Sequence, residues 1–271
     1  MRSKLKKQKI IAEILIALGF ISVIVFSILF IKQPLFYIGI IVGLLMMVVG
    51  RTMFNKLKDT INEKLIPEVY KAKLGKSIHR PLEGFNSGDI YQTNLFLHQD
   101  RFFSNDLVSG EVFGFKYKMS EVQFLDAKRD FKKFSSDVLF QGLFIEINVE
   151  SKIKGSVYIV PKATKLHKYL DKDNQISLSE PLASEFDVYS KNKKEATQLL
   201  NSEFGTLLQS VDDLFPNIYI AVKKHAIYIG IDSRKKPLDV KLFRRLDMSY
   251  LDVLSNEIIT IKEIVYTLYK K

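Results

Sequence analysis

Apolar residues gather in two uninterrupted runs near the start of the chain. The first run, residues 10–31, contains one charged residue, Glu13, and the second run, residues 34–50, contains none. As helices they would be about 33 Å and about 25 Å long, against a hydrocarbon core of roughly 30 Å. Only Lys32 and Gln33 separate the two runs. The pattern predicts a helical hairpin that crosses a membrane.

Small residues within these runs indicate how the two helices pack. Gly39 and Gly43 form a GxxxG pair, and Gly19 and Gly50 are further places where two helices can approach closely. Two other readings of the first run are less favoured. A cleaved signal peptide would have a shorter apolar run followed by a cleavage site of small residues. A buried hairpin in a soluble core would not need two charge-free runs in succession.

Basic residues flank the hairpin on one side only, and they predict its orientation. The connection between the runs holds Lys32 alone, so the excess of basic residues near both termini places both termini in the cytoplasm. These residues are expected to contact the anionic lipids of the inner leaflet. They are Arg2, Lys4, Lys6, Lys7, Lys9, Arg51, Lys56 and Lys58. Glu13 lies at the inner edge of the first run, within reach of water or Lys9.

The rest of the chain is expected to fold as an amphipathic stalk followed by one domain. The predicted divisions are residues 1–54 for the N-terminus and the two spans, 55–80 for a membrane-proximal stalk, and 81–271 for a soluble domain. The stalk is predicted to be helical over residues 52–74, with a break at Pro67, and to end at Gly75.

Alternating apolar and polar positions predict strands over most of the soluble domain. Strands are expected at residues 89–98, within a hairpin or meander at 107–124, in a second hairpin formed by 142–149 and 156–160, at 186–189, and in a third hairpin formed by 218–222 and 226–231. The third hairpin is apolar on both faces, which predicts a central place in the sheet. Residues 126–137 are expected to be a charged connection, and 161–181 a surface loop with a short helix.

Two segments show helical periodicity. Residues 191–213, capped by Ser190 and ended by Pro216, place apolar side chains on one face. Residues 249–269 carry a continuous apolar stripe that is expected to pack on the sheet, with a partner-binding or coiled-coil face as the alternative. The predicted fold class is therefore α+β: a transmembrane helical hairpin followed by a mostly antiparallel sheet with two or three packed helices.

Composition adds two constraints. The net charge is +11, and its concentration near the predicted membrane surface points to anionic lipid as the partner, with no nucleic acid expected. The chain has no cysteine, so it has no disulfide, no thiolate metal site and no cysteine nucleophile.

Known catalytic and cofactor motifs do not fit this sequence. Gly75-Lys76-Ser77 is similar to the end of a phosphate-binding loop, but Tyr70 stands where that loop needs its first glycine. A calcium loop at residues 171–176 fails because Ile176 replaces the required glycine. The sequence has no HExxH and no GxSxG motif. We therefore predict no cofactor, no metal and no catalytic residue.

Several polar residues are candidates for a site, but the sequence favours an ordinary structural role for each. Aromatic residues around His98 and Arg101 are able to stack nucleic-acid bases, but core strand residues explain them better. His225, with Lys223 and Lys224, is interpreted as a solvated turn. His79 and His167 fall in predicted loops without a partner in the sequence. An enzyme would have to use His98 with Asp100 and Arg101, or His167 with neighbouring lysines, in a shared pocket.

Four stretches of the soluble part resemble a bacterial family, domain-of-unknown-function family 3137. They are LVSGEVFGFKYKMSEVQF from Leu107, FQGLFIEINV from Phe140, SEFDVYSKNKKEATQLLN from Ser184 and IYIAVKKHAIYIGI from Ile218. The resemblance covers roughly residues 81–246. It implies a bacterial membrane protein with two spans and a cytoplasmic domain, and it carries over no active-site residue.

The sequence thus favours a membrane-anchored cytoplasmic interaction or sensing module over an enzyme. Its partners are expected to be inner-leaflet lipids, with a protein partner or self-association left open. Two alternatives remain. One is an enzyme that acts on lipid or envelope precursors at the inner leaflet, and the other is a small transporter or channel subunit, which would require oligomers.

Overall fold

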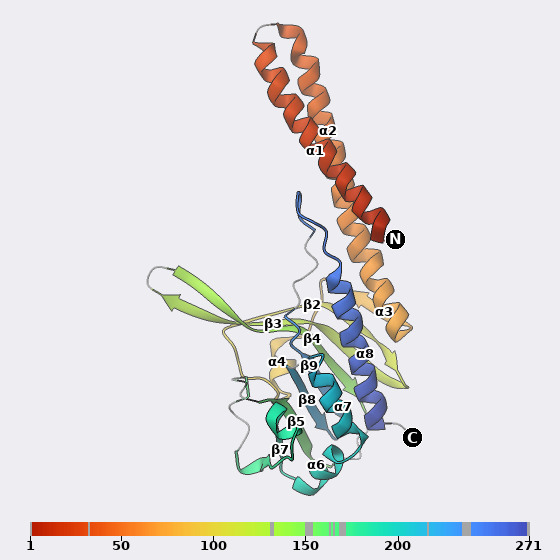
Figure 1. Cartoon of the computed structure of the whole chain (residues 1–271), viewed down its shortest axis with the longest axis vertical. Coiled ribbons are helices and arrows are strands. Elements are labelled where there is room, and N and C mark those ends of the chain that lie inside the picture. The colour runs from red at the N-terminus through yellow and green to blue at the C-terminus, as the bar shows by residue number, and fades with distance from the viewer. Residues whose placement is uncertain are drawn as a thin grey trace. The chain divides into compact units, whose positions relative to one another are not determined.

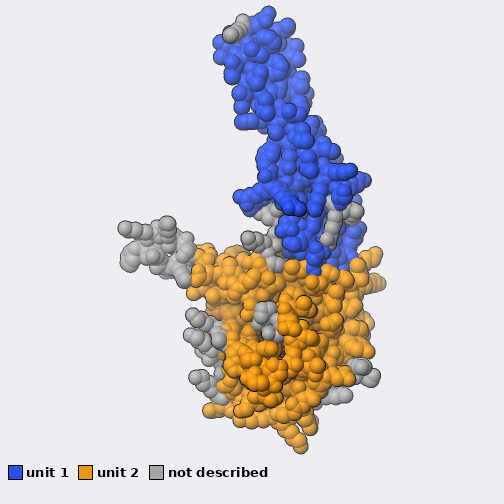
Figure 2. Space-filling model, in the orientation of Figure 1, with its two compact units in different colours: residues 1–69, 236–252 blue, residues 70–235, 253–271 orange. Residues whose placement is uncertain are grey.

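The computed structural model describes residues 2–31, 33–130, 133–149, 154–162, 164, 166–167, 172–215, 217–234 and 240–269 (Figure 1). The chain divides into two compact units, which Figure 2 colours separately. Unit 1 consists of residues 1–69 and 236–252, and unit 2 consists of residues 70–235 and 253–271. This division differs from the predicted boundaries after residues 54 and 80, because a segment from the C-terminal part joins the N-terminal unit.

Unit 1 is built on a hairpin of two long helices. Helix α1 (Arg2–Phe30) leads through a 3-10 turn (Pro34–Phe36) into α2 (Tyr37–Thr60). The two helices approach at glycines: a Cβ on Gly43 would lie 2.8 Å from the carbonyl oxygen of Gly19, and one on Gly50 would lie 2.8 Å from that of Ala12. The glycines therefore serve close packing inside this hairpin, as the sequence suggested.

Both helices are long and apolar enough to cross a membrane. Their large apolar side chains remain exposed along most of the hairpin, including Ile14, Ile24, Val42 and Leu45. Exposed apolar surface on this scale is unfavourable in water, which is consistent with a hydrocarbon environment.

The predicted stalk helix is continuous through Pro67. Five residues in π-helical geometry (Ile61–Leu65) connect α2 to α3 (Ile66–Leu74). A wider turn just before a proline accommodates the ring that would otherwise clash with the preceding turn, so the break predicted at Pro67 does not occur. Gly75 ends α3 as predicted, with a φ of 77°.

Unit 2 contains a nine-stranded antiparallel sheet with the order β1-β2-β3-β4-β9-β8-β5-β7-β6. The first four strands are β1 (Ser77–Arg80), β2 (Arg101–Val112), β3 (Phe115–Asp130) and β4 (Lys133–Asn148). The others are β5 (Ser156–Pro161), β6 (Gln175–Ile176), β7 (Phe186–Ser190), β8 (Ile218–Lys223) and β9 (Ala226–Ile231). The structure confirms the predicted α+β class and the central β8–β9 hairpin.

The predicted hairpin of β4 with β5 is wrong. β4 pairs with β3 and β9, whereas β5 pairs with β8 and β7. The β8–β9 hairpin buries nearly all of its residues and takes the places between them, because strands that are apolar on both faces need neighbours on both sides. The predicted turn residues 150–153 lie outside the described residues.

The segment predicted as a strand at residues 89–98 forms a short helix and turns. Helix α4 (Ser87–Tyr91) is followed by a turn in which Thr93 Oγ1 donates to the carbonyl of Ile90 and accepts from the amide of Leu95. Such local side-chain bonds offer the backbone an alternative to a strand ladder. Likewise, the predicted connection at 126–137 is an extension of β3 and β4, which pair from Leu125 with Val138 to Asp130 with Lys133.

The helix predicted over residues 191–213 is two helices, α6 (Lys193–Leu200) and α7 (Glu203–Asp212). Asn192, not Ser190, caps α6, and Ser202 caps α7 by accepting from the amide of Phe204. The second cap starts a new helix inside the predicted one. A further helix of four residues, α5 (Leu182–Glu185), and a 3-10 turn (Lys172–Asn174) precede β7.

The last helix, α8 (Ser249–Tyr269), buries its apolar stripe, including Leu254, Ile258, Ile261 and Val265. Within unit 2 it packs on the β2–β3 hairpin, where the ring centroids of Phe113 and Tyr266 are 5.7 Å apart. This contact confirms that the helix packs on the sheet.

Candidate functional site

An aromatic cluster covers part of the sheet in unit 2 and forms the floor for a cavity. Phe96, from the segment after α4, lies 5.0 Å from Phe124 and 5.1 Å from Phe140 between ring centroids. It also lies 5.0 Å from Tyr219 on β8. Edge and tilted contacts of this kind add to the apolar burial, so the segment is held firmly on the strands.

The cavity has a volume of about 630 Å³ and lies among the segment after α4, β5, β7 and the residues around Leu166. This size falls within the range typical of small-molecule sites, roughly 300–1,000 Å³. Its walls are Tyr91, Asn94, Phe96, Leu97, His98, Gly155, Ser156, Tyr158, Leu166, His167, Asn174, Tyr189, Ser190 and Lys191. Basic and neutral polar groups stand among aromatic rings, and no acidic residue is among the walls that the described residues form.

Tyr91 and His98 form one side of the cavity. Their ring centroids are 4.0 Å apart with planes tilted by 31°, and the amide of Gln99 donates to the Tyr91 hydroxyl at 3.2 Å. Partial burial raises the pKa of Tyr91, so the phenol stays neutral at physiological pH. The pair presents a fixed aromatic surface that includes the imidazole of His98.

His167 stands on another wall of the same cavity. It is buried, its ring centroid lies 5.9 Å from that of Tyr189, and its Nδ1 has no hydrogen-bond partner within the described part of the chain. Burial lowers the pKa of His167, while the charge of Asp187 acts in the opposite direction. A neutral imidazole with an unsatisfied nitrogen is ready to bind a polar group of a ligand.

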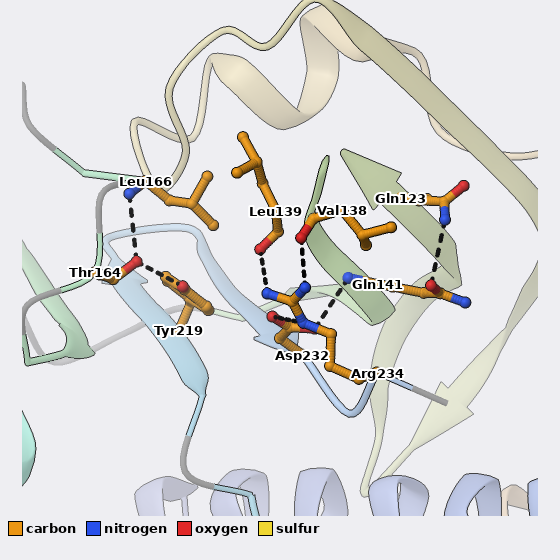
Figure 3. A network of polar contacts seen from close by, with 9 residues as sticks. All are labelled: Gln123, Val138, Leu139, Gln141, Thr164, Leu166, Tyr219, Asp232 and Arg234. Atoms are coloured by element: carbon orange, nitrogen blue, oxygen red, sulfur yellow. Dashed lines mark hydrogen bonds and ion pairs between the residues drawn. The ribbon is translucent and has the colours of Figure 1, made fainter. Parts of the chain in front are cut away.

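A polar network supports the residues that carry His167 (Figure 3). The hydroxyls of Thr164 and Tyr219 are 2.8 Å apart, and Thr164 Oγ1 accepts from the amide of Leu166 at 3.3 Å. The amide of Leu97 donates to the carbonyl of Leu166 at 2.8 Å. Burial raises the pKa of Tyr219 to about 12, so this hydroxyl is a permanent neutral anchor.

The same figure shows a second polar group at the edge of β4, formed by Asp232 and Arg234. Arg234 Nε donates to Asp232 at 2.9 Å, and its terminal nitrogens donate to the carbonyls of Val138 and Leu139. The β3–β4 register shifts here, between Phe124 and Leu125. The arginine donates hydrogen bonds to carbonyl groups at that irregularity. We therefore interpret the role of Arg234 as structural.

The structure brings together some of the residues considered for catalysis and separates others. His98 and His167 line one cavity, whereas Asp100 and Arg101 are not among its walls. His79 has a partner after all, since its Nε2 lies 3.1 Å from Asp106. Lys223 is half-buried, with its ammonium 5.5 Å above the Tyr228 ring, so its interpretation as a solvated turn residue is wrong. No group of three acidic, histidine or cysteine residues that could hold a metal occurs in the described ranges.

Sequence reasoning missed the cavity because its walls come from distant stretches. Tyr158 and Tyr189 lie on neighbouring strands, whereas Tyr91 is the last residue of α4, far earlier in the chain. The one available signal was the clustering of aromatic residues around His98, which was interpreted as strand core.

Most of the residues predicted to contact lipid are exposed in unit 1: Lys4, Lys6, Lys7, Arg51, Lys56 and Lys58. Lys9 is the exception. It is buried, and its ammonium group pairs with Glu13 and donates to the carbonyl of Arg244 at 2.6 Å, so it is not available to head groups. The side chain of Arg2 lies outside the described part of the structure.

The C-terminal part of the chain matches a known protein family. Residues 138–270 match the profile of the family described as "Protein of unknown function (DUF3137)". This part of the chain is therefore similar to the DUF3137 family. The match confirms the family that the sequence resembles, and it contains three of the four stretches that carried the resemblance, those that start at Phe140, Ser184 and Ile218. The stretch from Leu107 lies before it.

The matched segment includes most of β4, all of β5 to β9 and all of α8, and thus the cavity walls from Gly155 onward. No curated protein matches the chain. Among solved structures, the crystal structure of the mycobacterial trehalose monomycolate transport factor A, TtfA, is similar with 11% sequence identity and a TM-score of 0.42. That match covers 78% of this chain and 97% of the other.

Proposed function

We propose that this protein is a membrane-anchored binding or sensing module. The helical hairpin holds it in the membrane with both termini in the cytoplasm, and the unit 2 cavity binds a small ligand at the inner membrane surface. The observation that carries the proposal is the cavity of about 630 Å³ with aromatic walls and two histidines.

The wall chemistry indicates the ligand class. Rings of Tyr91, Phe96 and Tyr158 suit an apolar or aromatic body. Lys191 supplies a positive charge for an anionic group, and the ring nitrogens of His98 and His167 are available to hydrogen-bond it. No acidic residue is among the described wall residues, and Asp187, whose charge acts on His167, is not one of them. The expected ligand is therefore an amphipathic anion, with an apolar body and a carboxylate or phosphate.

Binding is favoured over catalysis, because reactive groups do not converge. In the described residues around the cavity, Ser190 Oγ accepts from the amide of Asn192 at 3.1 Å and is engaged in that turn. An enzyme that acts on lipid or envelope precursors stays the second candidate, and it is favoured by the shared position of His98 and His167.

A single-tryptophan reporter tests the proposal, since the natural chain contains no tryptophan. The full chain with Tyr158→Trp is reconstituted in nanodiscs and titrated with spin-labelled stearic acid, which quenches a nearby indole. We expect saturable quenching that is weaker with the uncharged methyl ester. A Leu214→Trp reporter, placed at an exposed site outside the cavity walls, serves as the control.

A cavity-filling variant makes the test specific. Ser156→Phe adds volume inside the cavity and should abolish saturable quenching, whereas Thr197→Phe, which adds the same ring on the exposed side of α6, should not. Equal quenching of the two reporters, or full quenching in the Ser156→Phe variant, would overturn the proposed site.

A further inference from the structure

The segment of residues 240–246 folds back onto the start of α1 within unit 1. Its contacts join residues more than two hundred positions apart in the chain. The amide of Phe243 donates to Glu13 Oε1 at 2.6 Å, and Lys9 Nζ donates to the carbonyl of Arg244 at 2.6 Å. Lys9 and Glu13, one helical turn apart, therefore hold the backbone of this segment as an ion pair.

These contacts fix an unusual backbone conformation. Phe243 has a φ of 57°, in the left-handed region that a bulky residue rarely adopts. The Glu13 carboxylate compensates by accepting its amide. The consequence is that Phe243 is 64% exposed, and Arg244 and Arg245 beside it are exposed as well. An aromatic ring and two guanidinium groups are thus presented outward from a tethered loop.

The loop and α1 enclose a cavity of about 500 Å³ in which positive charge predominates. Its walls are Lys6, Lys9, Ile10, Glu13, Phe243, Arg244, Arg245 and Leu246. Lys9 and Glu13 neutralise each other, so Lys6 and the two arginines remain for a ligand.

One further acid lies close to this cluster. Hydrogen bonding to Ser249 is the largest cause that lowers the pKa of Asp247, and the charges of Arg245 and Lys6 act in the same direction. The Asp247 carboxylate accepts the amide of Ser249 at 2.9 Å. It is therefore engaged at the start of α8 and offsets only part of the positive charge.

The position along α1 identifies the partner. Ile10 begins the uninterrupted apolar run, so the cavity lies where the apolar surface of the hairpin gives way to charge. In a membrane this is the level of the lipid head groups, where basic side chains meet phosphates and aromatic rings enter the acyl boundary.

We propose that Lys6, Arg244 and Arg245 bind the phosphate group of an anionic membrane lipid, with Phe243 inserted beside its acyl chains. The site requires the hairpin to lie in a membrane, which is part of the proposed function, but it is independent of the ligand cavity in unit 2. It adds a segment distant in sequence to the basic N-terminus as a lipid contact.

The test places a tryptophan on the loop. The full chain with Phe243→Trp is held in micelles that contain phosphatidylcholine and is titrated with phosphatidylglycerol, or with the same lipid brominated on its acyl chains. We expect a blue shift of the emission and quenching by the brominated lipid. Inorganic phosphate, added in excess, should not reproduce the shift, because the site takes a phosphate carried by a lipid.

Removal of basic side chains then distinguishes binding at this site from the general attraction between a basic protein and an anionic lipid surface. Arg244→Gln with Arg245→Gln, in the tryptophan reporter, should weaken phosphatidylglycerol binding by roughly thirty-fold, since each basic residue near an anionic surface contributes about a five-fold factor. The control is Lys4→Gln with Lys7→Gln, which removes equal charge from exposed positions of α1 that are not walls of the cavity.

Equal loss of affinity in the two double variants would overturn the site, because it would show that only total charge matters. An unshifted emission in phosphatidylglycerol would overturn it as well, as would a shift produced by inorganic phosphate or by an acidic peptide alone. If the purified chain disperses freely without detergent, the anchoring in the proposed function fails, and that result is recognised separately from any loss of head-group preference.

Discussion

Arg234 Nε lies 2.9 Å from the carboxylate of Asp232, two residues earlier in the chain. The carboxylate also accepts the amide of Gln141 at 3.0 Å, so the pair connects the end of β9 to the irregular part of β4. Asp232 is almost fully buried, while the arginine side chain is half exposed. The partly exposed guanidinium group also donates to the carbonyls of Val138 and Leu139, at the irregularity between β3 and β4.

Replacement of Asp232 by alanine should destabilise unit 2 clearly. The substitution leaves the amide of Gln141 buried without an acceptor and removes the partner of Arg234, at a cost of about 1–3 kcal/mol. Thermal unfolding of the full chain in micelles, followed by circular dichroism, should show a melting temperature lowered by roughly 2–10 °C. Asp137→Ala, on the exposed part of β4, is the comparison variant, and an equal shift there would contradict the role of Asp232.

Replacement of Asp232 by asparagine should change the pH dependence of stability. Burial raises the pKa of Asp232 in the folded state, so the folded chain binds this proton more tightly than the unfolded chain. The contribution of this group to stability is therefore fully present below pH 3.8 and is lost as the pH rises through the raised pKa. Melting curves of wild type and Asp232→Asn should diverge over that window, and parallel curves would count against the burial effect.

Replacement of His167 by glutamine should make the chain less sensitive to mild acid. Burial lowers the pKa of His167, so the unfolded state binds this proton more tightly, and stability falls as the pH drops from about 6.5 through the lowered pKa. The variant should lose part of this fall. The measurement is the melting temperature between pH 7.5 and pH 5. His225→Gln, at an exposed turn, should retain the wild-type dependence.

Replacement of Gly43 by leucine should separate the two helices of unit 1. Its Cβ alone would lie 2.8 Å from the carbonyl oxygen of Gly19, so the backbones must move apart, at a cost of about 1–3 kcal/mol. Loss of thermal stability in micelles checks this. Gly88→Ala, where an added Cβ meets nothing within 4 Å, should melt close to wild type. An unaffected Gly43→Leu variant would mean that the glycines do not set the helix separation.

The proposed orientation can be measured directly, because the natural chain has no cysteine. A membrane-impermeant maleimide, applied to intact cells, should label Gln33→Cys, which lies between the two predicted spans. It should label Thr197→Cys only after the cells are made permeable. Labelling of Thr197→Cys in intact cells would place unit 2 on the other side of the membrane.

Local patterns in the chain predicted much of this architecture. The helical hairpin, the stalk helix, the β8–β9 hairpin and the last helix each depend on contacts near in sequence, where apolar periodicity is a direct consequence of burial. The sequence also placed Glu13 within reach of water or Lys9, since the two residues are one helical turn apart, and the structure pairs it with Lys9.

Tertiary structure decided everything that depends on which distant segments become neighbours. Apolar periodicity predicts that a strand is buried, but it does not predict which strand lies beside it. The sequence therefore predicted a hairpin of β4 with β5, whereas the β8–β9 hairpin lies between these two strands. The cavity that joins His98 to His167 and the loop held by Lys9 likewise follow from long-range packing. Their members carry no common sequence pattern, because the free energy that brings them together belongs to the folded chain as a whole.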